Sequence, residues 1–330
     1  MNAPVKFVVV GSGNIAGTYI SAIENIYDAE IKGIISRKIP DAEDKINIPV
    51  FNSLSAIPNN SFDAVIICTP NGLHNIHTIE AAKLGKHVLC EKPIDIETQA
   101  IDNMITTCRE NNVKLGVAYQ RRFSSDNPIV KDLIDTGALG RIFSVDLSVK
   151  NYRDDNYYNS AEYRGTYAID GGGPFIQQAS HYIDLYQWYF GRPMKIVSKL
   201  NTFVHKIEVE DHGAVICEHS DGMIGTISAS TATRPGFPAK LEIYTDKGYL
   251  IMVNDVITEW EIEGVENPSA NKDINLHTGS STAVVDDTRN HELLVKDFID
   301  SIRTGKEPLI TGESAKIATE IVLDIYNNQF

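Results

Sequence analysis

Hydrophobic positions in the first 120 residues follow two patterns in turn, short continuous runs and helical spacing. The runs are typical of strands buried on both faces and lie at residues 6–10, 30–35, 64–68, 87–90 and 114–118. Positions three or four apart predict helices from residue 15 onward and at 77–84 and 97–111. Strands that alternate with helices through short loops indicate an α/β fold with a parallel, doubly wound sheet.

After about residue 120 the spacing of hydrophobic positions changes. A helix is predicted at 128–136, and residues 142–149 alternate strictly, as a strand half buried against a core would. The positions expected to face that core are Phe143, Val145, Leu147 and Val149. Helical spacing returns at 175–190, 290–303 and 313–328, and further strands are predicted at 195–204, 212–219, 223–231, 239–245 and 248–263.

The second half therefore predicts an α+β fold, with a mostly antiparallel open sheet and helices on one side of it. The polar residues 264–287 are expected to form a surface excursion. At 330 residues the chain is long enough for two domains that each bury a core. We place these domains at residues 1–121 and 122–330.

The composition limits the classes of partner and the cellular compartment that we expect for this chain. A formal net charge of −14 argues against nucleic acid as a partner. No stretch approaches the roughly 18 apolar residues of a membrane span, and no export signal precedes the first strand. The cysteines lack C-x-x-C spacing, and Cys68 and Cys90 lie in apolar runs, so we expect buried free thiols in a reducing cytoplasm. Without an H-E-x-x-H motif or clustered Cys and His, no metal site is expected.

A glycine-rich segment ends the first predicted strand and opens the first predicted helix: Gly11-Ser12-Gly13-Asn14-Ile15-Ala16-Gly17. We interpret it as a dinucleotide fingerprint of the G-x-G-x-x-G type. Gly11 permits a tight turn, Gly13 lets the backbone approach a pyrophosphate, and Gly17 is expected to let helix and strand pack closely. The helix N-terminus supplies amide donors to the anion. Residues 1–121 are therefore predicted to be a Rossmann domain that binds a nicotinamide dinucleotide.

The end of the second strand normally has an acidic residue that holds the adenosine ribose. This chain has Ser36, Arg37 and Lys38 there. A hydroxyl and two cations would bind a 2′-phosphate, which a carboxylate would repel. NADP(H) is therefore favoured over NAD(H). The alternative is that Arg37 stacks on adenine and Lys38 is a solvated surface charge, which would leave the site open to both cofactors.

Two loops that follow later strands face the same edge of the predicted sheet. One contains Thr69, Pro70, Asn71 and His74, and the other Glu91-Lys92-Pro93. We expect all of these residues except Pro93 to contact the cofactor. A residue before a proline has an extended backbone, so Lys92 can hold its ammonium at that edge. An ammonium there can polarise a substrate hydroxyl or donate to a carbonyl. Considered in isolation, an adjacent Glu and Lys more often form a surface pair.

The second domain has one segment rich in candidate chemistry, at residues 170–184. Its glycines at 171–173 would start a helix and let another segment or a ligand come close. Gln177, His181 and Asp184 then fall three or four residues apart, on one helix face. A histidine there can exchange a proton at neutral pH. An isolated histidine, however, is more often a hydrogen-bonded core residue.

In this order, the motifs resemble those of the Gfo/Idh/MocA family of oxidoreductases along essentially the whole chain. The specific marks are the glycine fingerprint, Thr-Pro-x-x-x-His at 69–74, Glu-Lys-Pro at 91–93 and Gly-Gly…His-x-x-Asp at 172–184. The resemblance implies that Lys92 and His181 flank the reacting carbinol of a sugar or a sugar-derived polyol. Further cofactor contacts are then expected from Gln120, Tyr163 and Arg164, and substrate contacts from Arg122, Tyr158, Arg164 and Gln177.

A narrower likeness is to UDP-N-acetylglucosaminuronate 3-dehydrogenases, which usually have Trp at the position of Tyr163. It lies in Tyr157-Tyr158, Tyr163-Arg164-Gly165-Thr166 and Asp170-Gly171-Gly172-Gly173. Two positions depart from what the resemblance implies. Many family members place an Asp four residues before the histidine, whereas this chain has Gln177, which cannot relay a proton. The acidic residue after the second strand, normally kept by NAD-using members, is also missing.

The resulting hypothesis is an NAD(P)-dependent oxidoreductase that moves a hydride between nicotinamide and a secondary alcohol or ketone carbon of a sugar. Lys92 or His181 would exchange the hydroxyl proton, and Lys92 would stabilise charge on the oxygen. One rival is a cofactor-binding regulator without catalytic activity. Another is an enzyme that recycles a tightly bound cofactor, in sugar–sugar oxidoreduction or glycoside cleavage. The second-domain sheet supplies apolar surface for a homodimer or homotetramer.

Overall fold

The computed structural model describes residues 3–36, 48–270 and 288–330. The chain forms two compact units, the first made of Met1–Gln120 with Val284–Lys316, and the second of Arg121–Ala283 with Ile317–Phe330. The predicted domain boundary lies beside the first of these divisions. Residues 288–316, which we placed in the second domain, pack with the first unit.

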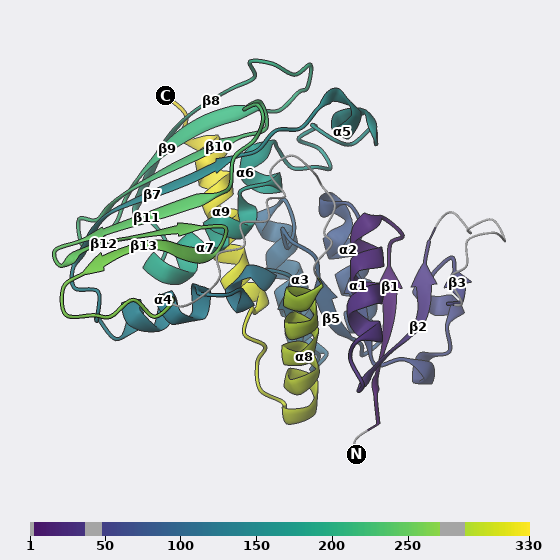
Figure 1. The fold of residues 1–330 in the computed structure, drawn as a ribbon. Coiled ribbons are helices and arrows are strands. Elements are labelled where there is room, and N and C mark those ends of the chain that lie inside the picture. The colour runs from purple at the N-terminus through teal and green to yellow at the C-terminus, as the bar shows by residue number, and fades with distance from the viewer. Residues whose placement is uncertain (1–2, 37–47, 271–287) are drawn as a thin grey trace. The chain divides into compact units, whose positions relative to one another are not determined.

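The first unit is built on a sheet of six parallel strands in the order β3-β2-β1-β4-β5-β6. Figure 1 labels β1, β2, β3 and β5 of this sheet. The strands are β1 (Val5–Val10), β2 (Ala29–Ile35), β3 (Val50–Phe51), β4 (Ala64–Ile67), β5 (His87–Cys90) and β6 (Leu115–Val117). All except β3 lie within one residue of the prediction, because fully buried strands are continuous apolar runs. Two residues are too short a run to show a period, so β3 was not predicted.

Three helices connect strands of this sheet, α1 (Asn14–Glu24), α2 (His74–Lys83) and α3 (Thr98–Glu110), and a fourth, α8 (Arg289–Thr304), joins the unit from the distant segment. The chain passes from β1 to β2 on one side and to β4 on the other, so right-handed crossovers place helices on both faces. The carboxyl ends of β1 and β4 therefore meet at the switch point where such sheets bind ligands.

Helix α8 explains why residues 288–316 belong to the first unit. It packs against α1, and its Phe298 is fully buried against Gly116 of β6, where any larger side chain would collide with the ring. The next helix, α9 (Gly312–Asn327), begins in the first unit and ends in the second.

The second unit is built on a seven-stranded sheet in the order β13-β12-β11-β7-β10-β9-β8. Only β7 and β10 pair in parallel, and the other neighbours are antiparallel, as predicted. The strands are β7 (Ile142–Lys150), β8 (Lys195–Asn201), β9 (His212–Glu218), β10 (Ile224–Ser230), β11 (Lys240–Thr245), β12 (Gly248–Val253) and β13 (Val256–Ile262).

Two details of this sheet differ from the prediction. The single strand expected at 248–263 is two strands, because Asn254 and Asp255 have φ angles of 46° and 71° and reverse the chain. Val145 and Leu147 are buried as predicted, but Phe143 is 50% exposed. The pairing of β7 with β11 shifts beside Phe143, so this residue is left out of the register and turned away from the core.

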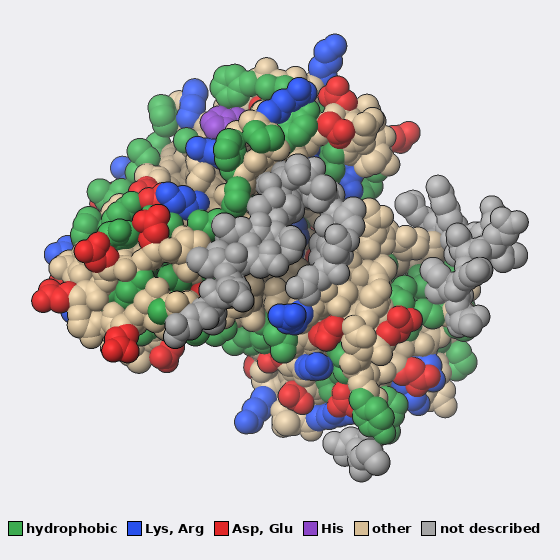
Figure 2. All heavy atoms as spheres, in the orientation of Figure 1, with side chains coloured by type: hydrophobic (Ala, Val, Ile, Leu, Met, Phe, Trp, Pro, Cys, Tyr) green, Lys and Arg blue, Asp and Glu red, His purple; other side chains and the backbone are tan. Residues whose placement is uncertain are grey.

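Helices cover one face of the second sheet. They are α4 (Asn127–Asp135), α6 (Pro174–Gln177), α7 (Ser180–Phe190) and the end of α9, with the short α5 (Asp155–Asn159) preceding α6 in the chain. Phe175 of α6 lies against Gly213, and Tyr186 of α7 lies against Gly225. The other face is outward, and in Figure 2 hydrophobic and charged side chains are interspersed over this sheet.

All four cysteines are buried and free, as predicted. Burial raises the pKa of Cys68 and Cys90 far above the ordinary thiol value, so these thiols are inert parts of the core. Within the described ranges, no helix combines the length and apolar character that crossing a membrane requires.

Candidate active site

The glycine-rich turn between β1 and α1 has the conformation that its sequence predicts. Gly11 has a φ of 113°, and a Cβ there would stand 2.5 Å from the carbonyl oxygen of Cys68 on β4. Its amide also donates to the carbonyl of Ile35 at 2.9 Å. Only glycine can therefore occupy this point, where three parallel strands end.

The backbone beyond the turn is accessible to an anion. Gly13 precedes the first residue of α1, and a Cβ at Gly13 would meet nothing within 4 Å. The first turn of α1 contains no acidic residue. On the neighbouring loop, the hydroxyl of Thr69 is buried and has no hydrogen-bond partner. Open backbone, helix amides and an unsatisfied hydroxyl fit the pyrophosphate and ribose groups of a dinucleotide.

The role that we predicted for Gly17 is wrong. Counted from Gly11, the third position of the fingerprint is Ala16, which is 2% exposed and packs in the unit's core. Gly17 is exposed, and a Cβ there would meet nothing within 4 Å. The small residue that lets helix and strand pack closely is therefore Ala16, as the pattern allows.

Ser36 joins the end of β2 to the glycine-rich turn. Its side chain is 7% exposed, and its hydroxyl shares a 2.8 Å hydrogen bond with that of Ser12. The position that usually holds an acidic residue is thus occupied by a neutral hydroxyl. Arg37 and Lys38, the other predicted contacts of the adenosine ribose, lie outside the described residues.

Glu91 is a buried support for Lys92 and not half of a surface pair. It is 7% exposed, accepts a 2.8 Å hydrogen bond from the hydroxyl of Tyr19, and accepts another from the amide of Lys92 at 3.0 Å. Burial raises the pKa of Glu91, and the Lys92 ammonium and the Tyr19 hydroxyl oppose that rise. Both oxygens of the carboxylate are therefore used to hold the start of the Glu-Lys-Pro loop.

Two further side chains hold the same loop. His74, which we expected to contact the cofactor, is fully buried, with its ring nitrogens 2.8 Å and 2.9 Å from the carbonyls of Pro93 and Thr69. Burial lowers the pKa of His74, and those carbonyls oppose the effect. Asp95 accepts from the amide of Asn75 on α2. His74 thus ties two loops together and has no exposed surface to offer a ligand.

A residue from α8 completes this cluster and was not predicted. His291 is 1% exposed and packs edge-on against Tyr19, with ring centroids 5.2 Å apart. Its Nε2 lies 3.2 Å from Nε2 of Gln120, and Oε1 of Gln120 is buried without a hydrogen-bond partner. Gln120, a predicted cofactor contact, therefore has an acceptor available at the end of the sheet. The only sequence signal for His291 is its polarity on an apolar helix face.

In the second unit the glycines at 171–173 let two segments meet. A Cβ on Gly172 would collide with the Tyr326 hydroxyl, and one on Gly173 with the backbone of Glu210. The carboxylate of Glu210 accepts from the Gly173 amide at 3.1 Å and from the Tyr326 hydroxyl at 3.1 Å. The glycines thus serve close packing at the start of α6, one of the two roles predicted for them.

Gln177 and His181 do not share one helix, contrary to the prediction. The helix expected at 175–190 is interrupted between α6, which ends at Gln177, and α7, which begins at Ser180. The amide of Gln177 donates to the backbone carbonyl and carboxylate of Asp170, at 2.6 Å and 2.9 Å. His181 is the second residue of α7 and is half-buried.

Arg122, a predicted substrate contact, is instead part of the core. It is 2% exposed and donates to both carboxylate oxygens of Asp184, at 2.8 Å and 2.5 Å. Burial raises the pKa of Asp184, and the Arg122 guanidinium opposes that rise. A buried guanidinium needs a carboxylate partner, so this pair anchors the start of the second unit to α7.

The remaining predicted residues lie near α5. Tyr158 is half-buried, and its hydroxyl shares a 2.7 Å hydrogen bond with that of Thr231. Arg164 stacks over the ring of Tyr157 at 4.3 Å and lies 5.9 Å from that of Tyr163. The hydroxyl of Tyr157 accepts from the side chain of Gln178, which follows Gln177 directly. These side chains therefore lie beside the segment that leads to His181.

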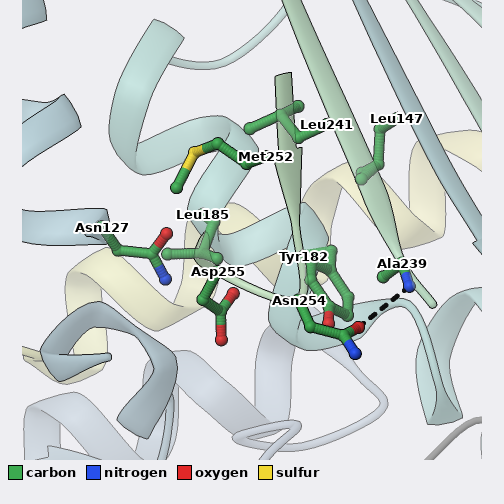
Figure 3. Close-up of a pocket in the computed structure, with 9 residues that line it drawn as sticks. All are labelled: Asn127, Leu147, Tyr182, Leu185, Ala239, Leu241, Met252, Asn254 and Asp255. Atoms are coloured by element: carbon green, nitrogen blue, oxygen red, sulfur yellow. Dashed lines mark hydrogen bonds between the residues drawn. The ribbon is translucent and has the colours of Figure 1, made fainter. Parts of the chain in front are cut away.

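The void under the second sheet is not a substrate site. It has room for about 10 Å³, at most a single water molecule. Figure 3 shows Tyr182 and Leu185 of α7 facing it, and the side chain of Asn254 accepting from the amide of Ala239. Among the described residues, no group of three or more His, Cys, Asp or Glu side chains is placed to hold a metal ion.

A Rossmann sheet with an open glycine turn, followed by an α+β unit, defines the class as a nicotinamide-dependent oxidoreductase. Two family models agree: residues 5–119 match the oxidoreductase family with a NAD-binding Rossmann fold, and residues 129–251 match the Gfo/Idh/MocA C-terminal domain. The chain belongs to the Gfo/Idh/MocA family.

Similar proteins include inositol dehydrogenases and a dehydrogenase solved in complex with a nucleotide sugar. The crystal structure of the WlbA dehydrogenase from Bordetella pertussis, in complex with NADH and UDP-GlcNAcA, is 29% identical, with a TM-score of 0.86 over 98% of this chain and 96% of that one. The myo-inositol 2-dehydrogenase of Thermotoga maritima is 22% identical over 95% of this chain and 93% of its own. The scyllo-inositol 2-dehydrogenase (NADP(+)) IolW of Bacillus subtilis is 30% identical over 54% of this chain and 47% of its own. This chain is an NAD(P)-dependent oxidoreductase of sugar-type alcohols.

Proposed function

We propose that this enzyme oxidises or reduces a secondary carbinol of a sugar, and that Lys92 and His181 are the two groups that act on the substrate oxygen. The observation that supports this most directly is the buried carboxylate of Glu91, whose two oxygens hold Tyr19 and the amide of Lys92. These contacts fix the backbone from which the Lys92 side chain extends, and the Glu91 carboxylate also places a negative charge near its ammonium.

The cofactor supplies the hydride acceptor or donor at its nicotinamide ring. In this proposal, the protein holds the pyrophosphate of the cofactor with Gly11, Ser12, Gly13 and the first amides of α1, which begins with Asn14 and Ile15. Gln120 and the Thr69–Pro70–Asn71 loop contact the nicotinamide half. Open backbone at Gly13 and the unsatisfied Thr69 hydroxyl support these assignments.

Lys92 and His181 divide the work on the substrate hydroxyl. The ammonium of Lys92 stabilises negative charge on the oxygen, and one of the two groups exchanges its proton. Gln177 cannot relay a proton, and its amide group is bonded to Asp170. In the proposed mechanism, Gln177 therefore only orients the substrate or the segment before His181.

The substrate that we propose is a nucleotide-linked sugar. The WlbA dehydrogenase, whose structure contains UDP-GlcNAcA, is similar over nearly the full length of both chains. The aromatic and basic residues around α5, Tyr157, Tyr158 and Arg164, are the part of this chain that offers stacking and anion contacts. Of the two cofactors we favour NADP(H), because Ser36 and the following Arg-Lys replace the usual acidic residue.

We also propose a homodimer or homotetramer that forms through the outward face of the second sheet. Ile216 of β9 and Ile224 of β10 are 58% and 53% exposed there. Buried free thiols suit a reducing cytoplasm as the compartment.

The assay that tests the function follows reduced nicotinamide while the purified protein is offered UDP-GlcNAcA with NADP⁺ or NAD⁺, and keto-sugars with the reduced cofactors. Turnover with a tighter Kd for NADP⁺ than for NAD⁺ is the expected result. Cofactor binding without turnover would contradict the function and indicate a regulator. Cofactor that survives gel filtration, with no net change in its redox state during turnover, would indicate the cofactor-recycling enzyme.

A further inference from the structure

Two arginines in the second unit share one aromatic ring. The guanidinium carbons of Arg164 and Arg153 lie 4.3 Å and 5.5 Å from the centroid of the Tyr157 ring. Two like charges this close repel each other in a partly desolvated site. Burial lowers the pKa of Arg153, the hydroxyls of Tyr157 and Tyr158 oppose this, and the nearby Arg164 lowers it further. The cluster thus concentrates positive charge on a chain whose net charge is −14.

Arg164 has capacity for an anion. Its Nε is buried without a hydrogen-bond partner. In the part of the chain that the structure describes, no carboxylate lies within ion-pair distance of its guanidinium. Asp170, the acidic group that acts on the same Tyr157 ring, accepts from the amide of Gly165 and from Gln177. A half-buried guanidinium left in this condition is costly unless something binds it.

The backbone around Arg153 is fixed in advance. Its amide donates to the carbonyl of Thr231 at 2.9 Å, and its carbonyl lies 2.8 Å from Nε2 of His205. The side chain is 8% exposed. Tyr158 packs on the ring of His205, with centroids 4.9 Å apart, and its hydroxyl is bonded to Thr231. The Arg153 guanidinium also donates to the carbonyl of Tyr152 at 2.8 Å and lies over the Tyr157 ring, so the side chain is ordered before a ligand arrives, which favours binding.

The cluster is continuous with the segment that leads to His181. The hydroxyl of Tyr157 accepts from the side chain of Gln178, three residues before His181. An anionic group held by Arg153 and Arg164 would thus lie near the segment that contains Gln178. Arginine forks bind carboxylate and phosphate oxygens in pairs, which gives orientation as well as affinity.

We infer that Arg153, Tyr157 and Arg164 form an anion subsite that holds the negatively charged group, carboxylate or phosphate, of an acidic sugar substrate. The inference rests on the proposed function, because it names the class of sugar that this enzyme accepts. It predicts that the enzyme selects acidic or nucleotide-linked sugars over neutral polyols.

The test compares Arg164→Gln and Arg153→Gln with a matched control, Arg234→Gln. Arg234 also stacks on a tyrosine ring, that of Tyr152 at 4.7 Å, but it is exposed. Calorimetric binding to the full-length protein would use four probes: UDP-GlcNAcA, UDP-glucose, glucuronate and myo-inositol. Binding does not depend on turnover, so this readout separates failure of the subsite from failure of the proposed chemistry.

We expect each subsite variant to bind UDP-GlcNAcA about 10- to 100-fold more weakly, which is the effect of losing a charge-assisted hydrogen-bond pair. Arg164→Lys should recover part of the loss, since it restores charge without the fork. If the variants lose affinity for UDP-glucose but not for glucuronate, the subsite binds phosphate. If they lose affinity for glucuronate but not for UDP-glucose, the subsite binds carboxylate. Unchanged binding of all four probes, or equal losses with myo-inositol or in Arg234→Gln, would overturn the inference.

Discussion

Three buried carboxylates show how single residues in this protein accommodate charge. Asp184 is neutralised by the fork of Arg122. Glu91 receives a tyrosine hydroxyl and a backbone amide, and lies beside the Lys92 ammonium. Glu210 has only backbone amides and the Tyr326 hydroxyl, and burial raises its pKa to about 7. Burial raises the pKa of all three carboxyls, and in the first two a neighbouring cation, Arg122 or Lys92, opposes the rise.

Glu210 therefore makes the stability of the protein depend on pH. As pH rises from the ordinary value of 4.5 to about 7, the carboxyl ionises in the unfolded chain before it ionises in the folded one. The free energy of unfolding falls over that interval, by about 3 kcal/mol in all, and this contribution is flat above it. Glu210→Gln should remove this fall. Urea unfolding at pH 5 and pH 8 measures it.

The exposed neighbour Glu208 is the control for that experiment. Glu208→Gln should keep the wild-type difference between the two pH values. An identical pH slope in wild type and Glu210→Gln would show that Glu210 is not the group responsible.

At the scale of the elements, substitutions in the glycine turn before α1 can change cofactor binding without changing the stability of the fold. A Cβ on Gly13 has free space around it, so Gly13→Ala should fold with nearly wild-type stability. The added methyl would nevertheless occupy the face that a pyrophosphate approaches, and we expect the Kd of the cofactor to rise at least about tenfold. Fluorescence titration with reduced nicotinamide cofactors measures the Kd.

Gly17→Ala is the companion variant, three residues into α1. Gly17 is exposed and unobstructed, so alanine should stabilise the helix by about 0.5–1 kcal/mol and leave cofactor affinity unchanged. Equal cofactor affinity in the two variants would contradict the assignment of Gly13 to the pyrophosphate.

The elements also show which features can be predicted from sequence. Strands buried on both faces, such as β1 and β4, are predictable because each is a continuous run of apolar residues. The break between α6 and α7 is not, because the apolar spacing continues through Gln178 and Ala179. The segment before this break is held by Glu210 and Asp170, contacts that no local pattern contains.

The same reasoning applies to the site. Glu91 and the amide of Lys92 are adjacent in the chain, so the motif that contains their contact is visible in the sequence. We assigned Arg122 to the substrate because its carboxylate partner, Asp184, lies 62 residues away in the sequence, so no local pattern indicates the pair. His291 was missed because it reaches Tyr19 from a segment that the linear order of the chain suggests belongs elsewhere.

At the scale of the whole molecule, the outward sheet face is the surface that we expect to join subunits. Ile216 lies opposite Thr226 on the adjacent strand, with Ile224 two residues away. Ile216→Glu would place a charge in an apolar contact and should dissociate the oligomer. Sedimentation velocity measures the mass in solution.

Ile76 on α2, 56% exposed, is the matched control, and Ile76→Glu should keep the wild-type mass. A monomeric wild type, or an Ile216→Glu protein of unchanged mass, would exclude this face as the interface.

The proposed function depends most on Lys92, which is proposed to act on the substrate oxygen from a backbone that Glu91 holds. Its most direct test is the turnover number of Lys92→Met together with its cofactor Kd, with the exposed Lys83→Met as control. We predict a kcat about 10²- to 10⁴-fold lower, the usual contribution of a general acid–base group, with cofactor Kd unchanged and Lys83→Met like wild type. A Lys92→Met enzyme that turned over at the wild-type rate would contradict the account.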